Sequence, residues 1–361
     1  MVTPKGRQMP RYDAIVVGAG PGGCVAAFFL EHYSAGNLKV LLLERLDEMK
    51  HPRYHRMCGE GISRRAFRDL RPLRPMAVTS EINRAIEHWP GEISFEIKAD
   101  GFIIDRAELL RTLMSKFKAL GGEVQHETVT SVLGRGRGFE VNCLSGRSFE
   151  CANLIGADGA HSVVRRDCFG TQPKYSVVAD QYILDRGTLP SALQFSFDER
   201  YNGAYRWEFP AGNRTRIGFP KGSDPKPEGP LESHRRAIVF GGVGDIVKGH
   251  AGLVGDAAAQ TNPLTFGGIR TAMVAGKLAA EAVASGDLEM YQRRWMSSGF
   301  CSPYYMEAQL QLRSMDNQEL RRTVEGMGER VTTLGTVGAY LRKKEYRTLY
   351  WAYMLAELYG W

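Results

Sequence analysis

The sequence lacks several features that would assign a class of protein at once. No apolar stretch reaches the roughly 18 uninterrupted residues typical of a membrane-spanning helix. The six cysteines form no C-x-x-C pair, so metal-ligand spacing is absent and no metal site is expected. Scattered cysteines in a chain of this size are typical of reduced thiols, and we expect a cytoplasmic protein.

A secretory signal is also not expected. Lys5, Arg7 and Arg11 precede an uncharged run over 14–30, which superficially resembles such a signal. Four glycines and a proline interrupt this run, however, and they oppose a continuous apolar helix.

The composition is that of a globular protein. Apolar residues make up 43% of the 361 residues, and the mean hydropathy is −0.29, which excludes a disordered chain and a polytopic membrane protein. The length predicts two structural domains. A net charge of +7 permits an anionic partner, namely a nucleic acid, a lipid surface or a phosphate-bearing ligand.

The first 44 residues contain a dinucleotide-binding pattern. A β-branched run over 13–17 predicts a buried strand and leads into the G-x-G-x-x-G sequence over 18–23. A helix over 24–33 and a second strand over 39–44 are expected next.

Each part of this pattern has a physical role. Gly18 allows the tight turn, Gly20 lets the backbone approach a pyrophosphate, and Gly23 lets helix and strand pack closely. The free N–H groups of the helix attract the phosphates. Glu44 follows Gly23 by 21 residues and can bind the ribose hydroxyls. The candidate residues of this segment are Gly18, Gly20, Pro21, Gly22, Gly23, Glu44 and Arg45.

Two later motifs place an acid beside a glycine after a strand-like run. These are Asp158-Gly159 and Gly255-Asp256. With the dinucleotide pattern, and in this order, they resemble the p-hydroxybenzoate hydroxylase-like flavoprotein superfamily. The resemblance implies FAD as the cofactor, with Asp256 holding its ribityl chain.

Three further segments resemble the geranylgeranyl reductase family, which includes archaeal digeranylgeranylglycerophospholipid reductases. They are the cysteine-glycine motif over 58–63, the Y-x-W-x-F-P motif over 205–210 and the NPxTGGGI-like stretch over 262–269. Phe266 replaces the first glycine of the last motif, which puts a ring where relatives have none. The resemblance covers about 12–283.

The resemblance implies reduction of isoprenoid C=C bonds by hydride transfer from reduced flavin. Cys58 is the candidate catalytic residue, as a proton donor or as a residue that positions the acid through its backbone. Its neighbours Arg53, His55 and Arg56 favour a thiolate, which leaves the role of Cys58 open. A small residue that packs under the flavin is the competing interpretation.

Other candidate contacts follow from the same motifs. Arg106 opens a predicted helix and is equally well explained as a flavin contact or as a helix cap. A helix predicted over 269–284 carries Arg270 and Lys277 on one side and directs its dipole toward an electron-rich ring. The remaining candidate FAD contacts are Cys58, Gly59, Val129, Asp158, Gly159, Gly255, Asp256, Pro263, Gly267, Gly268 and Ile269.

Tyr205, Trp207 and Phe209 alternate along a predicted strand and therefore share one face. With Phe266 they are the candidate substrate contacts, as an apolar wall for a prenyl chain; core packing is the competing interpretation. Flavin-dependent halogenases carry a related motif, so a monooxygenase or halogenase acting on a small aromatic or polyketide substrate is the alternative function. A non-catalytic flavin-binding or lipid-carrier protein is a third.

The expected fold class is α/β, with a Rossmann-like FAD-binding domain interleaved with an antiparallel-sheet substrate domain, plus C-terminal helices. The FAD-binding domain is expected to comprise 1–75, 100–175 and 245–290. The substrate domain is expected over 76–99 and 176–244, and a helical region over 291–361. Strands are predicted at 93–97, 193–197 and 215–219.

The expected partners are a prenyl lipid and an external electron donor. No second complete G-x-G-x-x-G is present, since 241–245 lacks the final glycine, so the donor is ferredoxin or transiently bound NAD(P)H. The arginine-glycine repeats over 134–138 predict the turn of a hairpin between 123–133 and 139–143 rather than RNA binding, and no nucleic-acid partner is expected.

The C-terminal region is rich in aromatic residues beside the basic cluster over 342–344. This pattern suits a packed helical layer, which we favour, or peripheral contact with a membrane surface.

Overall fold

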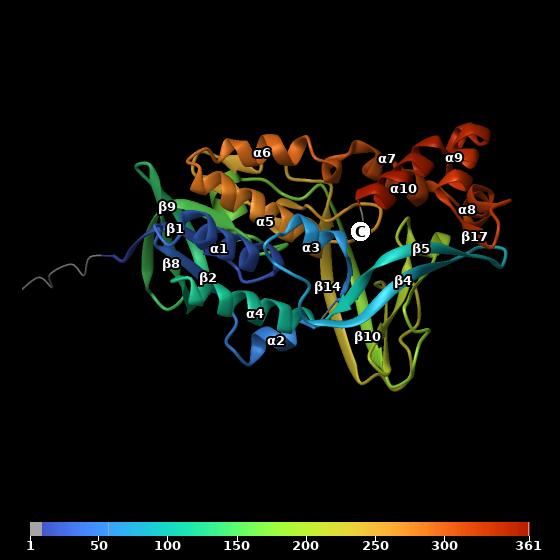
Figure 1. The fold of residues 1–361 in the computed structure, drawn as a ribbon, viewed down its shortest axis with the longest axis horizontal. Coiled ribbons are helices and arrows are strands. Elements are labelled where there is room, and N and C mark those ends of the chain that lie inside the picture. Colours follow the sequence, from blue (N-terminus) through green and yellow to red (C-terminus); the bar gives the residue numbers. More distant parts are fainter. Residues whose placement is uncertain (1–8, 57, 360) are drawn as a thin grey trace, which may run out of the picture.

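A computed structural model describes residues 9–56, 58–359 and 361, so Lys5 and Arg7 lie outside the described residues. The chain forms two β-sheets at opposite halves of an elongated molecule, with helices packed against both (Figure 1). This arrangement is the predicted α/β fold with parallel and antiparallel sheets and C-terminal helices.

The first sheet is built around parallel strands. Its order is β15-β16-β9-β1-β2-β6, and β8 joins β7 to β9. The burial of both faces of β1 and β2 by apolar side chains suits a parallel arrangement. The strands are β1 (Arg11–Val17), β2 (Val40–Glu44), β6 (Glu123–His126), β7 (Val129–Arg135), β8 (Gly138–Cys143), β9 (Ser148–Gly156), β15 (Val247–Lys248) and β16 (Ala251–Leu253).

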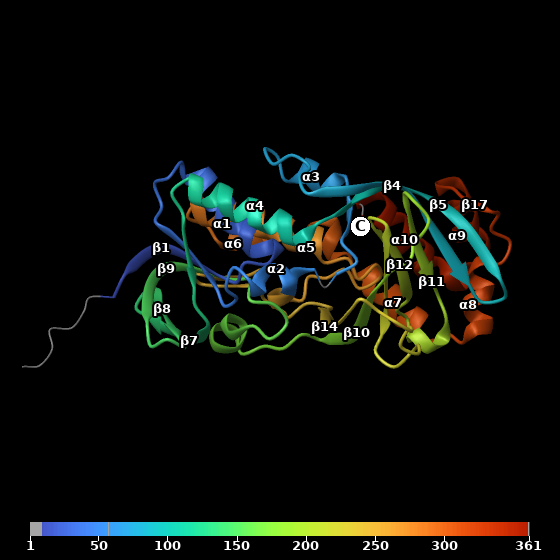
Figure 2. The same cartoon turned by 90° about the horizontal axis from the view of Figure 1, so that it is seen from below.

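Three long helices pack along this sheet, namely α1 (Pro21–Ser34), α4 (Arg106–Ala119) and α5 (Ile269–Ala284) (Figures 1 and 2). α1 and α5 approach each other closely, because a Cβ on Gly276 would lie 2.3 Å from the carbonyl oxygen of Gly22. The predicted helix over 269–284 is confirmed at both ends.

The second sheet is mostly antiparallel. Its order is β14-β10-β13-β12-β11-β4-β5-β17, and β3 also pairs with β5. The strands predicted at 93–97 and 215–219 lie within β5 and β13, and the strand predicted at 193–197 matches β11 except for Phe197, which lies just beyond it. The strands are β3 (Gly61–Ser63), β4 (Val78–Trp89), β5 (Ile93–Ile104), β10 (Tyr175–Leu184), β11 (Ala192–Ser196), β12 (Arg206–Ala211), β13 (Arg214–Pro220), β14 (Glu232–Phe240) and β17 (Arg330–Val331).

The C-terminal helices lie over the β4–β5 end of the second sheet (Figure 1). Tyr305, Leu349 and Tyr350 are buried in this layer, which confirms the predicted helical packing. The remaining helices are α2 (Lys50–His55), α3 (Arg65–Asp69), α6 (Glu289–Met296), α7 (Pro303–Ser314), α8 (Asn317–Val324), α9 (Thr333–Arg342) and α10 (Arg347–Tyr359). Short helical turns are η1 (Arg165–Phe169), η2 (Glu199–Tyr201), η3 (Gly255–Ala258), η4 (Gly299–Cys301) and η5 (Lys344–Tyr346).

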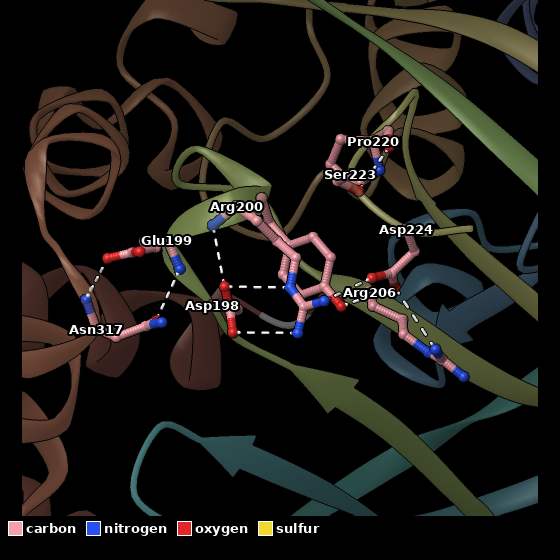
Figure 3. Close-up of polar contacts among 9 residues, drawn as sticks. Asp198, Glu199, Arg200, Arg206, Pro220, Ser223, Asp224 and Asn317 are labelled. Carbon is pink, nitrogen blue, oxygen red and sulfur yellow. Dashed lines mark hydrogen bonds and ion pairs between the residues drawn. The ribbon is translucent and has the colours of Figure 1, made fainter.

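A polar network ties α8 to the second sheet (Figure 3). The backbone N–H of Glu199 donates to Asn317 Oδ1, and the backbone N–H of Asn317 donates to Glu199 Oε2, both at 2.9 Å. Next to this pair, Arg200 bridges Asp198 and Asp224. These contacts fix the C-terminal layer against the loop that precedes β12.

One predicted element differs in extent. The hairpin arm expected over 123–133 is divided, because β6 pairs in parallel with β2 while β7 forms the hairpin with β8. The backbone N–H of Glu127 donates to the carbonyl oxygen of Glu44 and ends the parallel pairing there. The β7–β8 connection lies inside the predicted turn over 134–138 but is shorter, at 136–137, because Gly134 and Arg135 pair with β8.

Candidate active site

A cavity of about 1500 Å³ runs between the two sheets. It begins at the carboxyl ends of β1, β2 and β9 and continues to β4, β11, β12 and the C-terminal helices. Most residues predicted for the site line it. They are Gly18, Gly20, Pro21, Gly22, Glu44, Arg45, Cys58, Gly59, Arg106, Val129, Asp158, Gly159, Tyr205, Trp207, Phe209, Gly255, Asp256, Phe266, Gly267, Gly268 and Ile269. Gly23 and Pro263 do not line the cavity.

The dinucleotide loop has the geometry that its glycines predict. Gly18 has a φ of +98°, and a Cβ there would lie 2.5 Å from the carbonyl oxygen of Ala157. A Cβ on Gly23 would lie 1.8 Å from the carbonyl oxygen of Gly18, so Gly23 serves the contact between helix and strand rather than the cavity. The loop therefore brings bare backbone and the start of α1 to the cavity edge.

Glu44 ends β2 beside this loop and is buried. Its Oε2 accepts a hydrogen bond from the backbone N–H of Ala19 at 2.7 Å, and its Oε1 accepts one from Leu46 at 2.8 Å. These bonds hold the carboxylate at the cavity, where its remaining lone pairs can accept hydroxyl donors.

The two acid-glycine motifs differ in how their carboxylates are used. Asp158 accepts hydrogen bonds from the Ser162 hydroxyl and from the backbone N–H groups of Val163 and Val164, so it shapes the loop after β9. Asp256 lies in η3 and accepts from Thr261 Oγ1 at 3.2 Å. Burial raises the pKa of Asp256, and Thr261 and nearby arginines oppose the rise.

Two buried nitrogen atoms suit a polar ligand in this cavity. Among the described residues, neither His55 Nδ1 nor Trp207 Nε1 has a hydrogen-bond partner. His55 lies beside Gly20 and Trp207 beside Gly59, since a Cβ on each glycine would lie 3.9 Å from His55 Cε1 and 3.5 Å from Trp207 Nε1, respectively. Buried polar atoms without a partner are uncommon, so the residues present fit a bound group that offers polar atoms at both places.

The cysteine-glycine motif includes an acid that sequence reasoning missed. Cys58 is half-buried, and its Sγ accepts from the backbone N–H of Glu60 at 3.4 Å. Glu60 is buried, forms an ion pair with Arg216 at 2.5 Å, and accepts from the backbone N–H of Arg106 at 3.1 Å. Burial raises the pKa of Glu60 to about 7 against the opposing charges of Arg216 and Arg106. The position of Glu60 between Gly59 and Gly61 of the motif is the sequence feature that could have identified it.

The aromatic wall lies on the far side of this motif. Tyr205, Trp207 and Phe209 all line the cavity, and the Phe195 ring packs edge-on to Tyr205 and Phe209 at 5.0 and 5.3 Å. The Tyr205 hydroxyl donates to the carbonyl oxygen of Thr265. The wall is thereby joined to the loop that precedes α5.

Phe266 follows this contact and has a φ of +47°, in the left-handed region that favours glycine. Its ring packs edge-on to Tyr205 at 5.8 Å and to Phe240 at 5.3 Å. The glycine of the family motif is thus replaced by a ring in a glycine-like backbone conformation.

Beyond the wall, the cavity becomes an apolar chamber that contains one buried acid. Glu87 accepts from Trp89 Nε1 at 2.9 Å, and burial raises its pKa to about 7. Burial raises the pKa values of Tyr205 and Tyr353, and the negative charge of Glu87 adds to both rises. No sequence motif marks Glu87. The chamber is lined by Trp89, Phe95, Ile97, Phe195, Phe197, Leu264, Val324, Met327, Leu349 and Tyr353.

The two cations of α5 do not face the cavity. Arg270 binds Asp69 through two nitrogen atoms at 2.9 and 2.7 Å, and Lys277 donates to the carbonyl oxygens of Asp69 and Arg71. They hold α3 against α5, so any positive field at a bound ring would come from the N-terminus of α5 rather than from these side chains.

Comparison with known proteins gives concordant results. A family model described as "FAD binding domain" matches residues 11–182. Digeranylgeranylglycerophospholipid reductase 1 of Methanopyrus kandleri is 32% identical over 90% of this chain and 97% of its own length. Digeranylgeranylglycerophospholipid reductase of Methanothrix thermoacetophila is 31% identical over 80% of this chain and 84% of its own length.

Solved structures show the same fold. A geranylgeranyl bacteriochlorophyll reductase-like protein of Thermoplasma acidophilum aligns with a TM-score of 0.81 at 20% identity, over 94% of this chain and all of that chain. A flavin-dependent brominase aligns with a TM-score of 0.66 at 18% identity, over 94% of this chain and 93% of that chain. Fold similarity alone does not separate the two chemistries, but the sequence relationship does distinguish their families. The chain belongs to the geranylgeranyl reductase family and is an FAD-dependent oxidoreductase.

Proposed function

We propose that this protein reduces isoprenoid C=C bonds of a geranylgeranyl-type lipid. The observation that carries the proposal is the continuity of one cavity from the dinucleotide loop to the apolar chamber. Such a cavity suits an extended hydrocarbon chain that must reach a buried redox group. When bound, reduced FAD would supply the hydride.

The proposed FAD contacts begin at the dinucleotide loop and extend toward the aromatic wall. The backbone at Gly18, Gly20, Pro21 and Gly22 would receive the pyrophosphate, and Glu44 and Arg45 the adenosine ribose region. Asp256 would accept from the ribityl hydroxyls. The remaining proposed contacts are Gly59, Arg106, Val129, Asp158, Gly159, Gly255, Gly267, Gly268 and Ile269.

Reduction of an isolated alkene also requires a proton at the second carbon. We place Cys58 closest to this step, because it lies in the cavity between the dinucleotide half and the aromatic wall. Its Sγ accepts a hydrogen bond from the Glu60 N–H at 3.4 Å, which favours this orientation of the side chain. Tyr205, Trp207, Phe209 and Phe266 would hold the prenyl chain beside it.

The lipid and the electrons must both come from outside the protein. Among the described residues, no helix is long and apolar enough to cross a membrane. Tyr304 and Trp351 are partly exposed and their rings pack together between α7 and α10. Trp351 also contacts Tyr340, and the Arg347 side chain lies over the Tyr340 ring. We propose that this surface makes peripheral membrane contact. The electrons would come from ferredoxin or NAD(P)H.

The proposal is tested by anaerobic incubation of dithionite-reduced protein with a digeranylgeranylglyceryl phospholipid. Mass spectrometry should find products heavier by two hydrogen atoms for each saturated bond. A lipid that is unchanged under these conditions, with product formed from an aromatic substrate only when oxygen is admitted, would instead support a monooxygenase or halogenase.

A further inference from the structure

Two arginines of α3 line the same cavity as the proposed active site. Arg65 and Arg68 are one helical turn apart and therefore lie on neighbouring positions of one helix face. Both contribute to the cavity lining, with Arg65 half-buried and Arg68 exposed. The cavity thus has a basic margin, in contrast to its apolar chamber.

The acids around this margin are already engaged by other cations. Asp69 binds Arg270 at 2.7 Å, and Asp100 binds Arg64 at 2.7 Å. Over residues 9–56, 58–359 and 361, no acidic side chain lies within ion-pair distance of Arg65 or Arg68. Their charges even lower the pKa of Arg270, although burial is the main cause of that shift. The margin therefore carries positive charge that the protein itself does not neutralise.

An apolar path leads from this margin to the cysteine-glycine motif. The backbone N–H of Ser63, two residues before Arg65, donates to the carbonyl oxygen of Trp361 at 3.1 Å. The Trp361 ring packs with Phe209 in one apolar cluster, and Phe209 lies 2.8 Å from the position of a Cβ on Gly59. The other members of this cluster are Ile82, Ala85, Ala99, Ile103, Leu193, Phe195 and Trp207.

We propose that Arg65 and Arg68 bind the phosphate of the lipid substrate's head group, while the prenyl chain follows the apolar cluster to the site beside Gly59. This inference rests on the proposed function and names the polar part of its substrate. Guanidinium groups bind phosphate oxygens through paired hydrogen bonds, and two of them at one helical turn can engage one head group. An anionic amphiphile is the ligand class that matches both the charged margin and the apolar path.

The test compares two lipids that differ only in the phosphate, digeranylgeranylglyceryl phosphate and digeranylgeranylglycerol. Arg65→Ala and Arg68→Ala should each raise KM for the phosphate lipid about tenfold, because each removes a charge-assisted contact. KM for the neutral lipid should stay within about twofold of the wild-type value. Dithionite serves as reductant, so the docking of a donor protein cannot affect the result.

Matched controls are available in the same segment. Arg71 and Arg74 are exposed and do not line the cavity, so Arg71→Ala and Arg74→Ala should leave KM for both lipids unchanged. Equal KM values for the phosphate lipid in wild type and in Arg65→Ala/Arg68→Ala would overturn the inference. A defect confined to assays with a protein donor would also overturn it and would identify the arginines as a docking surface for that donor.

Binding without turnover separates this inference from the proposed function. The quenching of protein fluorescence by phosphate lipid, measured with oxidised holoenzyme, should give a Kd that rises about tenfold in each single variant. Wild type that binds the phosphate lipid through these arginines but saturates no bond would refute the reductase proposal and keep the head-group site. Wild type that saturates bonds with equal KM for both lipids would refute the head-group site and keep the reductase proposal.

Discussion

The buried carboxyl group of Glu87 should make the stability of this protein fall as the pH rises. Burial raises the pKa of Glu87 from 4.5 to about 7. Between these two pH values the folded protein retains a proton that the unfolded chain has released, so folding stability decreases with pH over this range. At ~1.4 kcal/mol per pKa unit, the loss above pH 7 reaches about 3 kcal/mol.

Glu87→Gln isolates this effect. The glutamine side chain can still accept the hydrogen bond from Trp89 Nε1 but carries no charge at any pH. The variant should match wild type near the ordinary pKa of a glutamate and should be more stable by about 3 kcal/mol above pH 7. Urea unfolding at constant, saturating FAD, followed by tryptophan fluorescence, measures the difference.

A surface acid provides a control of opposite sign. A hydrogen bond from Arg111 lowers the pKa of Glu108, so the stabilisation by Glu108 is present at neutral pH and is lost as the pH falls. Glu108→Gln should therefore be slightly less stable than wild type at neutral pH. The reasoning about Glu87 would be refuted by a Glu87→Gln variant that gains no stability above pH 7.

Four further substitutions test other parts of the site. Asp256→Ala should raise the Kd for FAD tenfold to a hundredfold, as measured by flavin fluorescence, because one charged hydrogen-bond acceptor is lost. Cys58→Ala should retain FAD and lose alkene reduction in the anaerobic assay. Phe266→Gly should be about 1 kcal/mol more stable than Phe266→Ala in urea, because the position has a positive φ. Gly218→Ala should raise KM for the prenyl lipid at unchanged FAD content, since its Cβ would lie 1.9 Å from the Trp207 ring and must displace it.

Each of these has a clear contrary result. A Kd for FAD in Asp256→Ala equal to the wild-type value would argue against its role at the ribityl chain, and wild-type turnover in Cys58→Ala would remove that residue from the catalytic step. Equal stability of the two Phe266 variants would mean that the backbone relaxes when the ring is removed. Unchanged KM in Gly218→Ala would separate Trp207 from lipid binding.

Local sequence was sufficient to predict the dinucleotide half of the fold. The glycines of the loop, the helix and Glu44 lie within 27 consecutive residues, from Gly18 to Glu44, and each acts on its near neighbours in the chain. The helix over 269–284 could also be predicted from local sequence, because its alanine-rich apolar pattern lies within the helix itself.

The substrate half depended on contacts between distant segments. Glu87 is brought into the apolar chamber by pairing of β4 with β11, which sets Glu87 opposite Phe195, more than 100 residues away in the chain. No period or motif near Glu87 encodes that partner. Local sequence also could not predict that Arg65 and Arg68 lack an acidic partner among the described residues, because Asp69 is bound by Arg270, 201 residues further along the chain.

The contacts of the two cations of α5 also depend on a distant segment. The spacing of Arg270 and Lys277 correctly predicted one shared side of the helix, but which element covers that side is set by the packing of α3. The conformation of Phe266 was partly predictable from sequence. The family motif has glycine at this position, and the positive φ of Phe266 gives the physical reason for that preference.

The most direct measurement of the central claim is anaerobic reoxidation of the reduced flavin by the lipid. Dithionite-reduced protein, freed of excess reductant, is mixed with digeranylgeranylglyceryl phosphate while the visible absorbance of oxidised flavin is recorded. We predict that absorbance returns without oxygen, with one flavin reoxidised for each double bond saturated. Flavin that stays reduced with the lipid and reoxidises only when oxygen is admitted would contradict the proposed reduction.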